Sequence, residues 1–281
     1  MAATLVQNSY GKSLVRLLKV SRDSDVHEIQ NLTINIALDG DFDAIHTAGD
    51  NSACLATDTM KNTVYALAGE TRENENIESF GRRLAAYFLK ENAQVSRVRL
   101  EIYEHGWKRM KFDEGHHEHS FIRGSDEKRV ARLDTTRGGE TIESGIEDLV
   151  VLKTTRSGFA GFIKDKYTTL PETTDRILST SVKAVWRYAN ADDATDSAWR
   201  SIRTKILKTF AGHDSLSVQH TLYAMGQALL DDFPAVEEIA FSLPNIHCLP
   251  VDMTKFGQQN DNRIFIPTDE PHGLIEARLS R

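Results

Sequence analysis

The order strands, helices, strands occurs twice along the chain, and this repetition constrains the fold more than any other feature of the sequence. In the first half, an apolar, β-branched stretch at 14–20 and an alternating stretch at 26–38 predict two strands that form a hairpin. Helical patterns follow at 59–68 and 73–92, and strand-like alternation returns between 98 and 133. The first half is therefore predicted to run from strands through helices back to strands.

The second half restarts the same order after the break at 137–139. A strand is predicted at 149–152, a helix is predicted to open at Thr174-Asp175, and amphipathic helices are predicted at 196–210 and 217–233. Three further strands are predicted at 239–243, 248–253 and 263–267. Grouped strands and grouped helices favour the α+β class over a doubly wound α/β fold, in which the two alternate singly.

The length of the chain agrees with two domains. A chain of 281 residues lies where one hydrophobic core stops growing, so two domains of about 140 residues each are compatible with it. The restart of the pattern places the predicted boundary between Arg137 and Gly138. We therefore expect one domain at 1–137 and a second at 138–281.

Charge and cysteine content argue against several classes of function. The formal net charge is −7, whereas a protein that binds nucleic acid needs a basic face for the phosphates. No apolar run approaches the roughly 20 residues of a membrane span, and the N-terminal residues lack the apolar core of a signal peptide. Two cysteines cannot form a disulfide framework. We therefore expect a cytoplasmic protein that binds neither nucleic acid nor membrane, with Cys54 and Cys248 as reduced thiols.

The segment His116-His117-Glu118-His119 is the most conspicuous group of potential metal ligands in the sequence. Neighbouring side chains of a strand point to opposite faces, so only His117 and His119 could share one, and a third ligand would have to come from elsewhere. A solvated strand end is the simpler interpretation, and we expect no metal site. The sequence also lacks the dinucleotide-binding, phosphate-loop, zinc-protease and serine-hydrolase motifs.

Several other residues could carry chemistry but have ordinary structural explanations when each is taken alone. Phe159 lies in a turn rich in glycine and phenylalanine, which can present an aromatic face to a flat ligand or simply pack. Lys12, which enters the first strand, and Arg176, near the predicted helix start, would ordinarily be solvated charges. Asn245 and His247 are one residue apart in an extended segment, so their side chains would share a face.

Taken together, several blocks of the sequence resemble the uricase (urate oxidase) family, in the same order and along nearly the whole chain. Their number and order make the resemblance highly specific. The block at 119–123 covers part of the histidine cluster and accounts for it without a metal. The blocks are Tyr10-Gly11-Lys12 with Val15-Arg16, then 47–51, 56–65, 119–123, 152–155, 159–162, 165–170, 175–178, 217–219 and 243–247.

The resemblance implies a fold and an assembly. Each chain would contain two tandem tunnelling-fold (T-fold) domains, in which antiparallel sheets with helices on one face close into a barrel when several subunits assemble. The assembly would be a homotetramer whose sites lie at subunit interfaces. The repeated order of strands and helices agrees with this fold.

The resemblance also implies an activity, which is the oxidation of urate by O₂ and water to 5-hydroxyisourate with release of hydrogen peroxide. This reaction would use no metal and no organic cofactor. Lys12, Thr57 and His247 match the catalytic positions of the family. Lys12 would act as the base, Thr57 would relay the proton, and His247 would support the relay.

Four residues would bind the substrate directly. Phe159 would stack on the flat urate ring, and the planar guanidinium of Arg176 would pair with its negative charge. The Gln219 amide offers both a donor and an acceptor to the edge of the ring, and Val218 would contribute its backbone N–H.

Two further matches, Asn245 and Asp58, complete the implied site. Asn245, together with Thr57, would hold O₂ or water over the ring. Asp58 would sit beside the substrate on the same loop as Thr57, and that loop would come from the neighbouring subunit. The site is therefore expected only in the oligomer.

The C-terminal residues depart from the peroxisomal members of the family. Leu279-Ser280-Arg281 is not the Ser-Lys-Leu signal, which favours a bacterial-type cytoplasmic enzyme. Two alternatives keep the fold and change the chemistry. One is a purine- or pterin-binding T-fold enzyme with a histidine-bound zinc, and the other is a T-fold protein that binds a purine without turnover.

Overall fold

A computed structural model of the chain describes residues 3–70 and 75–281. The chain divides into two compact units. The first unit consists of Met1–Gly145 with Asn190–Asp196, and the second of Ile146–Ala189 with Ser197–Arg281. The boundary predicted between residues 137 and 138 comes from the repeated order of strands and helices, not from contacts within the structure. It stays a prediction.

Long antiparallel strands form the sheet of the first unit. They are β1 (Tyr10–Ser21), β2 (Glu28–Gly40), β3 (Val95–Phe112), β4 (Gly115–Thr136) and the start of β5 (Gly139–Lys153). The strands lie in the sheet in chain order, and β2 pairs with β1 and β3, while β4 pairs with β3. The pairs β1–β2 and β3–β4 can therefore form as hairpins, whereas the helices of the unit lie in the chain between β2 and β3.

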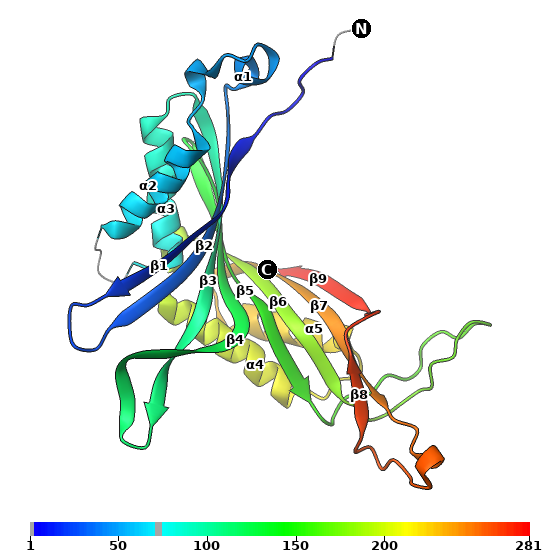
Figure 1. Cartoon of the computed structure of the whole chain (residues 1–281). Helices are drawn as coiled ribbons and strands as arrows, with labels where there is room; N and C mark the ends of the chain where they lie inside the picture. Colours follow the sequence, from blue (N-terminus) through cyan, green and yellow to red (C-terminus); the bar gives the residue numbers. More distant parts are fainter. Residues whose placement is uncertain (1–2, 71–74) are drawn as a thin grey trace. The chain divides into compact units, whose positions relative to one another are not determined.

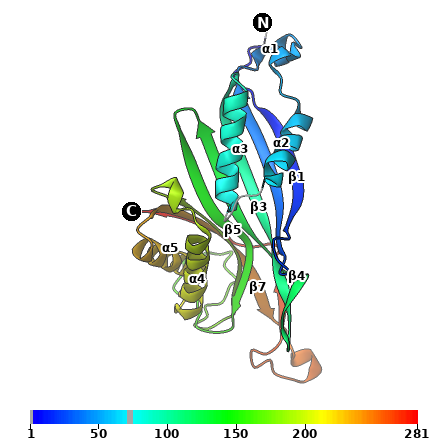
Figure 2. The same ribbon diagram turned by 90° about the vertical axis from the view of Figure 1, so that its left-hand side faces the viewer.

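Two helices cover one face of this sheet, as Figure 1 and Figure 2 show. After α1 (Asp43–Thr47) and the short η1 (Asn51–Ala53), α2 (Thr57–Gly69) packs on β1, and α3 (Ile77–Glu91) packs on β3 and β4. Successive side chains of a strand point to opposite faces of the sheet, so every second residue faces these helices, and these residues are mostly apolar. The buried set includes Ile34, Ile36, Leu38, Leu84, Phe88, Leu100 and Ile102.

The second unit repeats the plan of strands, two helices and strands. Its elements are the rest of β5, β6 (Leu178–Tyr188), α4 (Asp196–Gly212, from Ser197), α5 (Val218–Asp232), β7 (Val236–Pro250), η3 (Thr254–Phe256), β8 (Phe265–Thr268) and β9 (Leu274–Ser280). β7 pairs with β6, with β9 over its first half and with β8 at its end. Gly226 lets α5 approach β9 closely, because a Cβ there would lie 2.8 Å from Leu279. The core of the second unit includes Trp186, Ile202, Ile206, Leu222, Leu229 and Phe241.

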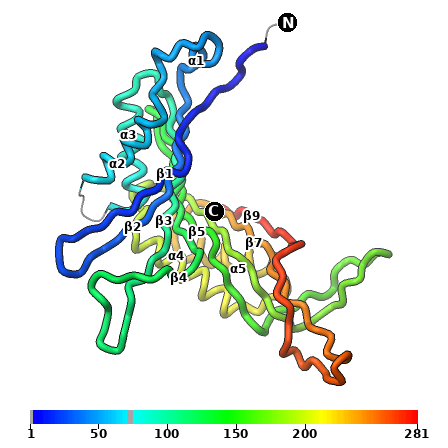
Figure 3. The backbone as a smooth tube through the Cα atoms, viewed as in Figure 1, coloured from blue at the N-terminus to red at the C-terminus, as the bar shows by residue number. Residues whose placement is uncertain are grey.

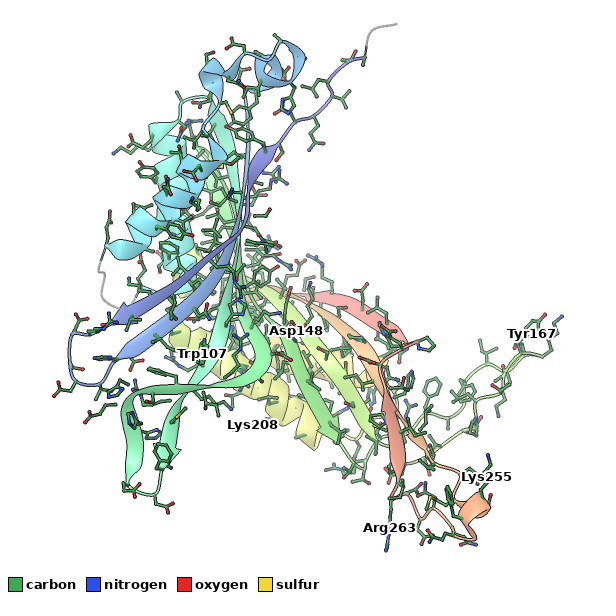
Figure 4. The ribbon with its side chains drawn as sticks, in the orientation of Figure 1. Trp107, Asp148, Tyr167, Lys208, Lys255 and Arg263 are labelled. Atoms are coloured by element: carbon green, nitrogen blue, oxygen red, sulfur yellow. The ribbon has the colours of Figure 1, made fainter. Side chains whose placement is uncertain are left out.

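Two long excursions leave the strands of the second unit (Figure 3). One joins β5 to β6 over residues 154–177, and the other joins β7 to β8 over residues 251–264. Figure 4 shows Tyr167 near the tip of the first excursion and Lys255 and Arg263 in the second. The first excursion is the one that carries Phe159 and Arg176.

Most predicted elements are confirmed. The strands at 14–20 and 26–38 are β1 and β2, and the helices at 59–68, 196–210 and 217–233 are α2, α4 and α5. The helix predicted at 73–92 is α3, although its first two predicted residues lie outside the described part of the chain. The strands predicted at 239–243 and 248–253 are parts of one strand, β7, and the strand predicted at 263–267 overlaps β8.

The helix predicted to open at Thr174-Asp175 is wrong. These residues belong to the irregular end of the loop, and β6 follows from Leu178. The Asp175 carboxylate accepts hydrogen bonds from Thr155 Oγ1 at 2.8 Å and from the Ser157 N–H at 3.5 Å, so it does not cap a helix. Among the described residues, no helix is long and apolar enough to cross a membrane.

Candidate active site

Lys12 stands directly before an irregularity in β1. Up to Lys12 the register with β2 is regular, and it shifts before Val15. Leu14, inside this bulge, has φ = 58°, and its N–H donates to Asn35 Oδ1 at 2.8 Å. A bulge redirects the side chains next to it. The half-buried Lys12 therefore follows a regular part of β1 and precedes a bulge that the hydrogen bond to Asn35 fixes.

Thr57 and Asp58 form the first turn of α2, where a negative charge is favourable. The Asp58 carboxylate accepts hydrogen bonds from Lys61 Nζ at 2.5 Å and from Asn62 Nδ2 at 2.9 Å. The hydrogen bond and charge of Lys61 lower the pKa of Asp58, and the charge of Lys12 adds to this shift. Lys12, Thr57 and Asp58 therefore share one neighbourhood in the first unit.

Backbone hydrogen bonds close the long loop that carries Phe159 and Arg176. The Phe159 N–H donates to the Thr173 carbonyl at 2.7 Å, and the Thr173 N–H donates back at 3.0 Å. The Arg176 N–H donates to the Ser157 carbonyl at 2.6 Å. As a result, the Arg176 guanidinium carbon lies 5.3 Å from the centre of the Phe159 ring, although seventeen residues separate the two in the chain.

The Arg176 guanidinium is half-buried and has no acidic partner among the described residues. Its Nε is buried without a hydrogen-bond partner in that part of the chain. Burial lowers the pKa of Arg176 below its usual range. A half-buried cation of this kind can pair with an anion from outside the chain, since residues 3–70 and 75–281 supply none.

The segment before α5 is bound to the same loop. Ser157 and Ser215 form a parallel bridge, and the Gly158 N–H donates to the Ser215 carbonyl at 2.8 Å. The Ser215 N–H in turn donates to the Arg156 carbonyl at 2.9 Å. These bonds place the start of α5 beside the segment that also receives the Arg176 N–H.

Val218 and Gln219 are the first two residues of α5. The Ser217 hydroxyl caps the helix by accepting the His220 N–H at 3.1 Å. The N–H groups of the first turn have no partner within the helix, and they form its positive end. Val218 is 4% exposed, whereas the Gln219 side chain is exposed. This geometry suits a backbone contact from Val218 and a side-chain contact from Gln219.

Asn245 and His247 lie two positions apart in β7, so their side chains share a face of the strand. Asn245 pairs with Thr180, near the start of β6, and β6 begins just after Arg176. His247 pairs with Thr268 of β8. Both residues are half-buried. They therefore lie at the end of the sheet from which the Arg176 loop departs.

The predicted site residues form one cluster in each unit. The first unit holds three of the nine and the second holds six, which are Phe159, Arg176, Val218, Gln219, Asn245 and His247. The sequence analysis missed two residues that hold these clusters in place, Tyr10 and Asp175. The only signal for either was its position next to a candidate residue, in Tyr10-Gly11-Lys12 and in Asp175-Arg176.

Two other features of the first unit include none of these nine residues. In the β3–β4 hairpin the rings of His117 and His119 are 4.7 Å apart, but no group of three or more His, Cys, Asp or Glu in the described chain is arranged to hold a metal ion. A pocket of about 500 Å³ lies over the strands at Asn35, Arg99 and Arg132, and none of the nine predicted residues lines it.

Comparisons with known proteins agree over almost the whole chain. A family model described as uricase matches residues 8–134 and 142–276. A uricase of Arthrobacter globiformis is 46% identical over 277 residues, which is 99% of this chain and 90% of the relative. The crystal structure of uricase from that organism matches with a TM-score of 0.94 at 45% identity, covering 100% of this chain and 96% of that one. A uricase of Emericella nidulans is 38% identical over 295 residues, which is 99% of this chain and 98% of the relative.

Proposed function

The chain belongs to the uricase family, and on this premise we propose that it oxidises urate with O₂ and water to 5-hydroxyisourate and hydrogen peroxide. It is an oxidoreductase with the fold of its relatives, two tandem T-fold domains. In the reaction urate loses two electrons, O₂ takes up two electrons and two protons to become hydrogen peroxide, and water supplies the new hydroxyl group. The proposal includes no resident metal or organic cofactor.

The observation that carries the proposal is that Arg176 is a half-buried cation without an acidic partner among the described residues. Its guanidinium lies 5.3 Å from the Phe159 ring. Urate is a flat anion, so it would supply both the missing negative charge and a partner for an aromatic face. The Phe162 ring stacks on one face of Phe159, with centroids 4.8 Å apart and planes 11° apart, so urate would stack on the other face.

The second-unit cluster would bind urate and O₂. Arg176 would pair with the negative oxygen and a ring nitrogen, and Gln219 would match the opposite edge with its amide. The Val218 N–H at the positive end of α5 would bind a further acceptor of the ring. Asn245, on the strand beside the loop, would hold O₂ or water over the ring.

The first-unit cluster would move the proton. Urate gives up electrons to O₂ more readily after it loses a further proton, so the site needs a base. Lys12 would take that proton through the Thr57 hydroxyl, and His247 would support the relay from the other cluster. Asp58, which is held by Lys61 and Asn62, would border the substrate.

We propose that two subunits of a homotetramer share each site. The first-unit cluster of one chain would meet the second-unit cluster of its neighbour, and the sheets of the assembled subunits would close into a barrel. The support is that the nine residues divide between two compact units, while the family resemblance assigns Thr57 and Asp58 to the neighbouring subunit.

An aerobic urate assay with a chelator tests the proposed function. We expect the ultraviolet absorbance of urate to fall and catalase-sensitive peroxide to form at an unchanged rate when the protein has been dialysed against a chelator. Heat-denatured protein is the control. No consumption of urate under air would refute the function, and loss of activity on chelation would refute the absence of a metal.

A cytoplasmic location is part of the same proposal. Cys54 and Cys248 are both free thiols, which suits a reducing compartment. Fractionation of cells that express the native protein tests this location, because recovery outside the cytoplasmic fraction would contradict it.

A further inference from the structure

The residue Tyr10 connects the strand that carries Lys12 to the segment that leads into Thr57. Its phenolic oxygen accepts the Leu55 N–H at 2.8 Å, across forty-five residues of sequence. Leu55 lies two residues before Thr57, in the extended stretch between η1 and α2. This inference rests on the proposed function, which gives Lys12 and Thr57 their roles.

The Tyr10 end of this connection is held in place by its strand and by a buried ring. Tyr10 and Lys12 are two positions apart in the regular part of β1, so their side chains share a face of the strand. Between them, Gly11 presses against β2, where an added Cβ would lie 1.8 Å from the Ile36 carbonyl oxygen. The Tyr10 ring meets the fully buried Phe42 edge to face, with centroids 4.7 Å apart. The hydroxyl is thus fixed relative to Lys12.

Within the described residues, the other hydrogen bonds of the segment that receives this bond are local, such as that from the Met60 N–H to the Ala56 carbonyl at 3.2 Å. Ala56, the N-cap residue of α2, makes no side-chain cap. The preceding turn is fixed at Ala53, whose carbonyl accepts Gln94 Nε2 at 2.9 Å, and at Cys54, whose N–H donates to Asn51 at 3.0 Å. From there to Thr57, the Tyr10 hydroxyl is the side-chain contact that ties the backbone to β1.

The hydroxyl also keeps its proton. Burial raises the pKa of Tyr10 to about 12, and the neighbouring Cys54 adds to this shift. A neutral phenol offers lone pairs to the Leu55 N–H and brings no negative charge near Lys12. A phenylalanine would preserve the ring contact with Phe42 and remove only the contacts of the hydroxyl, with the Leu55 N–H and with the Cys54 side chain of the same segment.

We propose that Tyr10 is a positioning residue that sets the distance between Lys12 and Thr57 through its hydrogen bond to Leu55. Without this bond the start of α2 could move relative to β1, and the proton relay would lose its alignment. The four groups that would bind urate directly, Phe159, Arg176, Val218 and Gln219, belong to the other unit, so most of the affinity for urate would be kept.

The test compares Tyr10→Phe with Tyr65→Phe. Tyr65 is the matched control because its hydroxyl also joins α2 to β1, by donating to the Arg16 carbonyl at 3.4 Å, but it lies far from Leu55 along the helix. Urate binding is measured without O₂, when no turnover occurs, and kcat is measured in air. The wild-type rate reports on the proposed function, whereas the ratio of variant to wild type reports on Tyr10.

We expect Tyr10→Phe to lower kcat about tenfold, which is part of the 10²- to 10⁴-fold that a positioned base contributes. The Kd for urate should stay within about twofold, and Tyr65→Phe should change neither quantity by more than that. Replacing Tyr10 with 3-fluorotyrosine, whose oxygen is a weaker acceptor, should give a smaller loss of kcat, and it serves if Tyr10→Phe fails to fold. Equal kcat values for the Tyr10 and Tyr65 variants, or a loss of kcat matched by an equal loss of urate binding, would overturn the proposal.

Discussion

Arg176 combines a charge with partial burial, and these two properties oppose each other in a protein. Its Nε is buried without a partner in the described chain, and its guanidinium carbon lies 5.3 Å from the centre of the Phe159 ring. Thr57, in contrast, carries no charge of its own. Its small hydroxyl side chain lies at the start of α2, near the charge of Lys12. The two residues are therefore expected to control different steps, binding for Arg176 and turnover for Thr57.

Replacing Arg176 should weaken the binding of urate. We expect Arg176→Ala to raise the Kd for urate about a hundredfold, since truncating one partner of a buried charge pair costs roughly 2–5 kcal/mol. Arg176→Lys keeps the charge without the planar fork and should fall in between. Anaerobic titration with urate measures both. Arg187→Ala is the control, because Arg187 forms an exposed ion pair with Glu237 in the same unit, and an equal loss there would contradict the assignment.

Replacing Thr57 should slow turnover more than it weakens binding. We expect Thr57→Ala to reduce kcat by about ten- to a hundredfold, because the hydroxyl would carry the proton between substrate and Lys12. Steady-state kinetics in air and urate titration without O₂ separate the two effects. Thr59→Ala removes an exposed hydroxyl from the same helix and should leave kcat unchanged. Similar changes in affinity alone for Thr57→Ala and Arg176→Ala would rule out the division of roles.

At the level of elements, the sequence patterns predicted the helices and strands that depend on contacts between residues close in the chain. The 3.6-residue periodicity of apolar side chains identified α3 and α5, and alternation identified β1 and β2. The pair Thr174-Asp175 carries a helix-start signal, but partners about twenty residues earlier in the chain use the Asp175 carboxylate. A partner so far away cannot be found from the residues next to Asp175.

The candidate site depends even more on contacts that spacing does not reveal. Phe159 and Arg176 meet only because the loop between them folds back on itself, and α5 joins them through the bridge at Ser215. The nine residues were identified by resemblance to a family, not by their pattern. Tyr10 escaped notice because its partner is a backbone N–H, which carries no signature in the sequence.

A buried ionic cluster ties several elements of the first unit together. Arg129 of β4 donates to Glu78 of α3 at 2.6 Å and to Asp196, where α4 begins, at 2.5 Å. The Ser144 hydroxyl of β5 donates to the other oxygen of Glu78 at 2.6 Å. Burial raises the pKa of Glu78, and the charge of Arg129 and the Ser144 hydrogen bond oppose this shift. The cluster matters for stability, because Glu78 is 1% exposed.

Removing the cation of this cluster should destabilise the fold in a pH-dependent way. We expect Arg129→Met to cost about 3–5 kcal/mol near neutral pH, because Glu78 would keep a buried charge without its main partner. The loss of Arg129 raises the folded-state pKa of Glu78 further above its unfolded value, so the variant loses stability as pH rises through that pKa and recovers part of it on acidification. Urea unfolding at several pH values measures the deficit. The double variant Glu78→Gln/Arg129→Met should lose the part of this pH dependence that belongs to Glu78 and keep the part from Glu104, a carboxyl whose pKa is raised by burial and lowered by the charge of Arg129. An identical deficit of the single variant at every pH would contradict the explanation.

At the level of the whole molecule, the division of site residues between the units predicts which inactive variants can rescue each other. If one subunit supplies Thr57 and its neighbour supplies Arg176, random mixing of Thr57→Ala and Arg176→Ala chains should restore about a quarter of the wild-type sites. Mixing Lys12→Ala with Thr57→Ala should restore none, because both residues lie in the first unit. The urate assay after joint refolding measures both mixtures. Rescue in neither mixture would mean that each site is built within one chain.

The first unit contains a segment that is synthesised long after the rest of the unit, because it lies much further along the chain. Residues Asn190–Asp196 belong to it although they follow β6 in the chain. Asn76 Nδ2 donates to the Ala194 carbonyl at 2.7 Å, and Arg82 pairs with Asp192 at 2.7 Å. During synthesis on the ribosome, Asn76 and Arg82 must wait for these partners, and Arg129 must wait for Asp196, until most of the chain has emerged. The nascent N-terminal half therefore stays unfinished for much of translation, and this is the period in which it would depend on chaperones to keep it from aggregating.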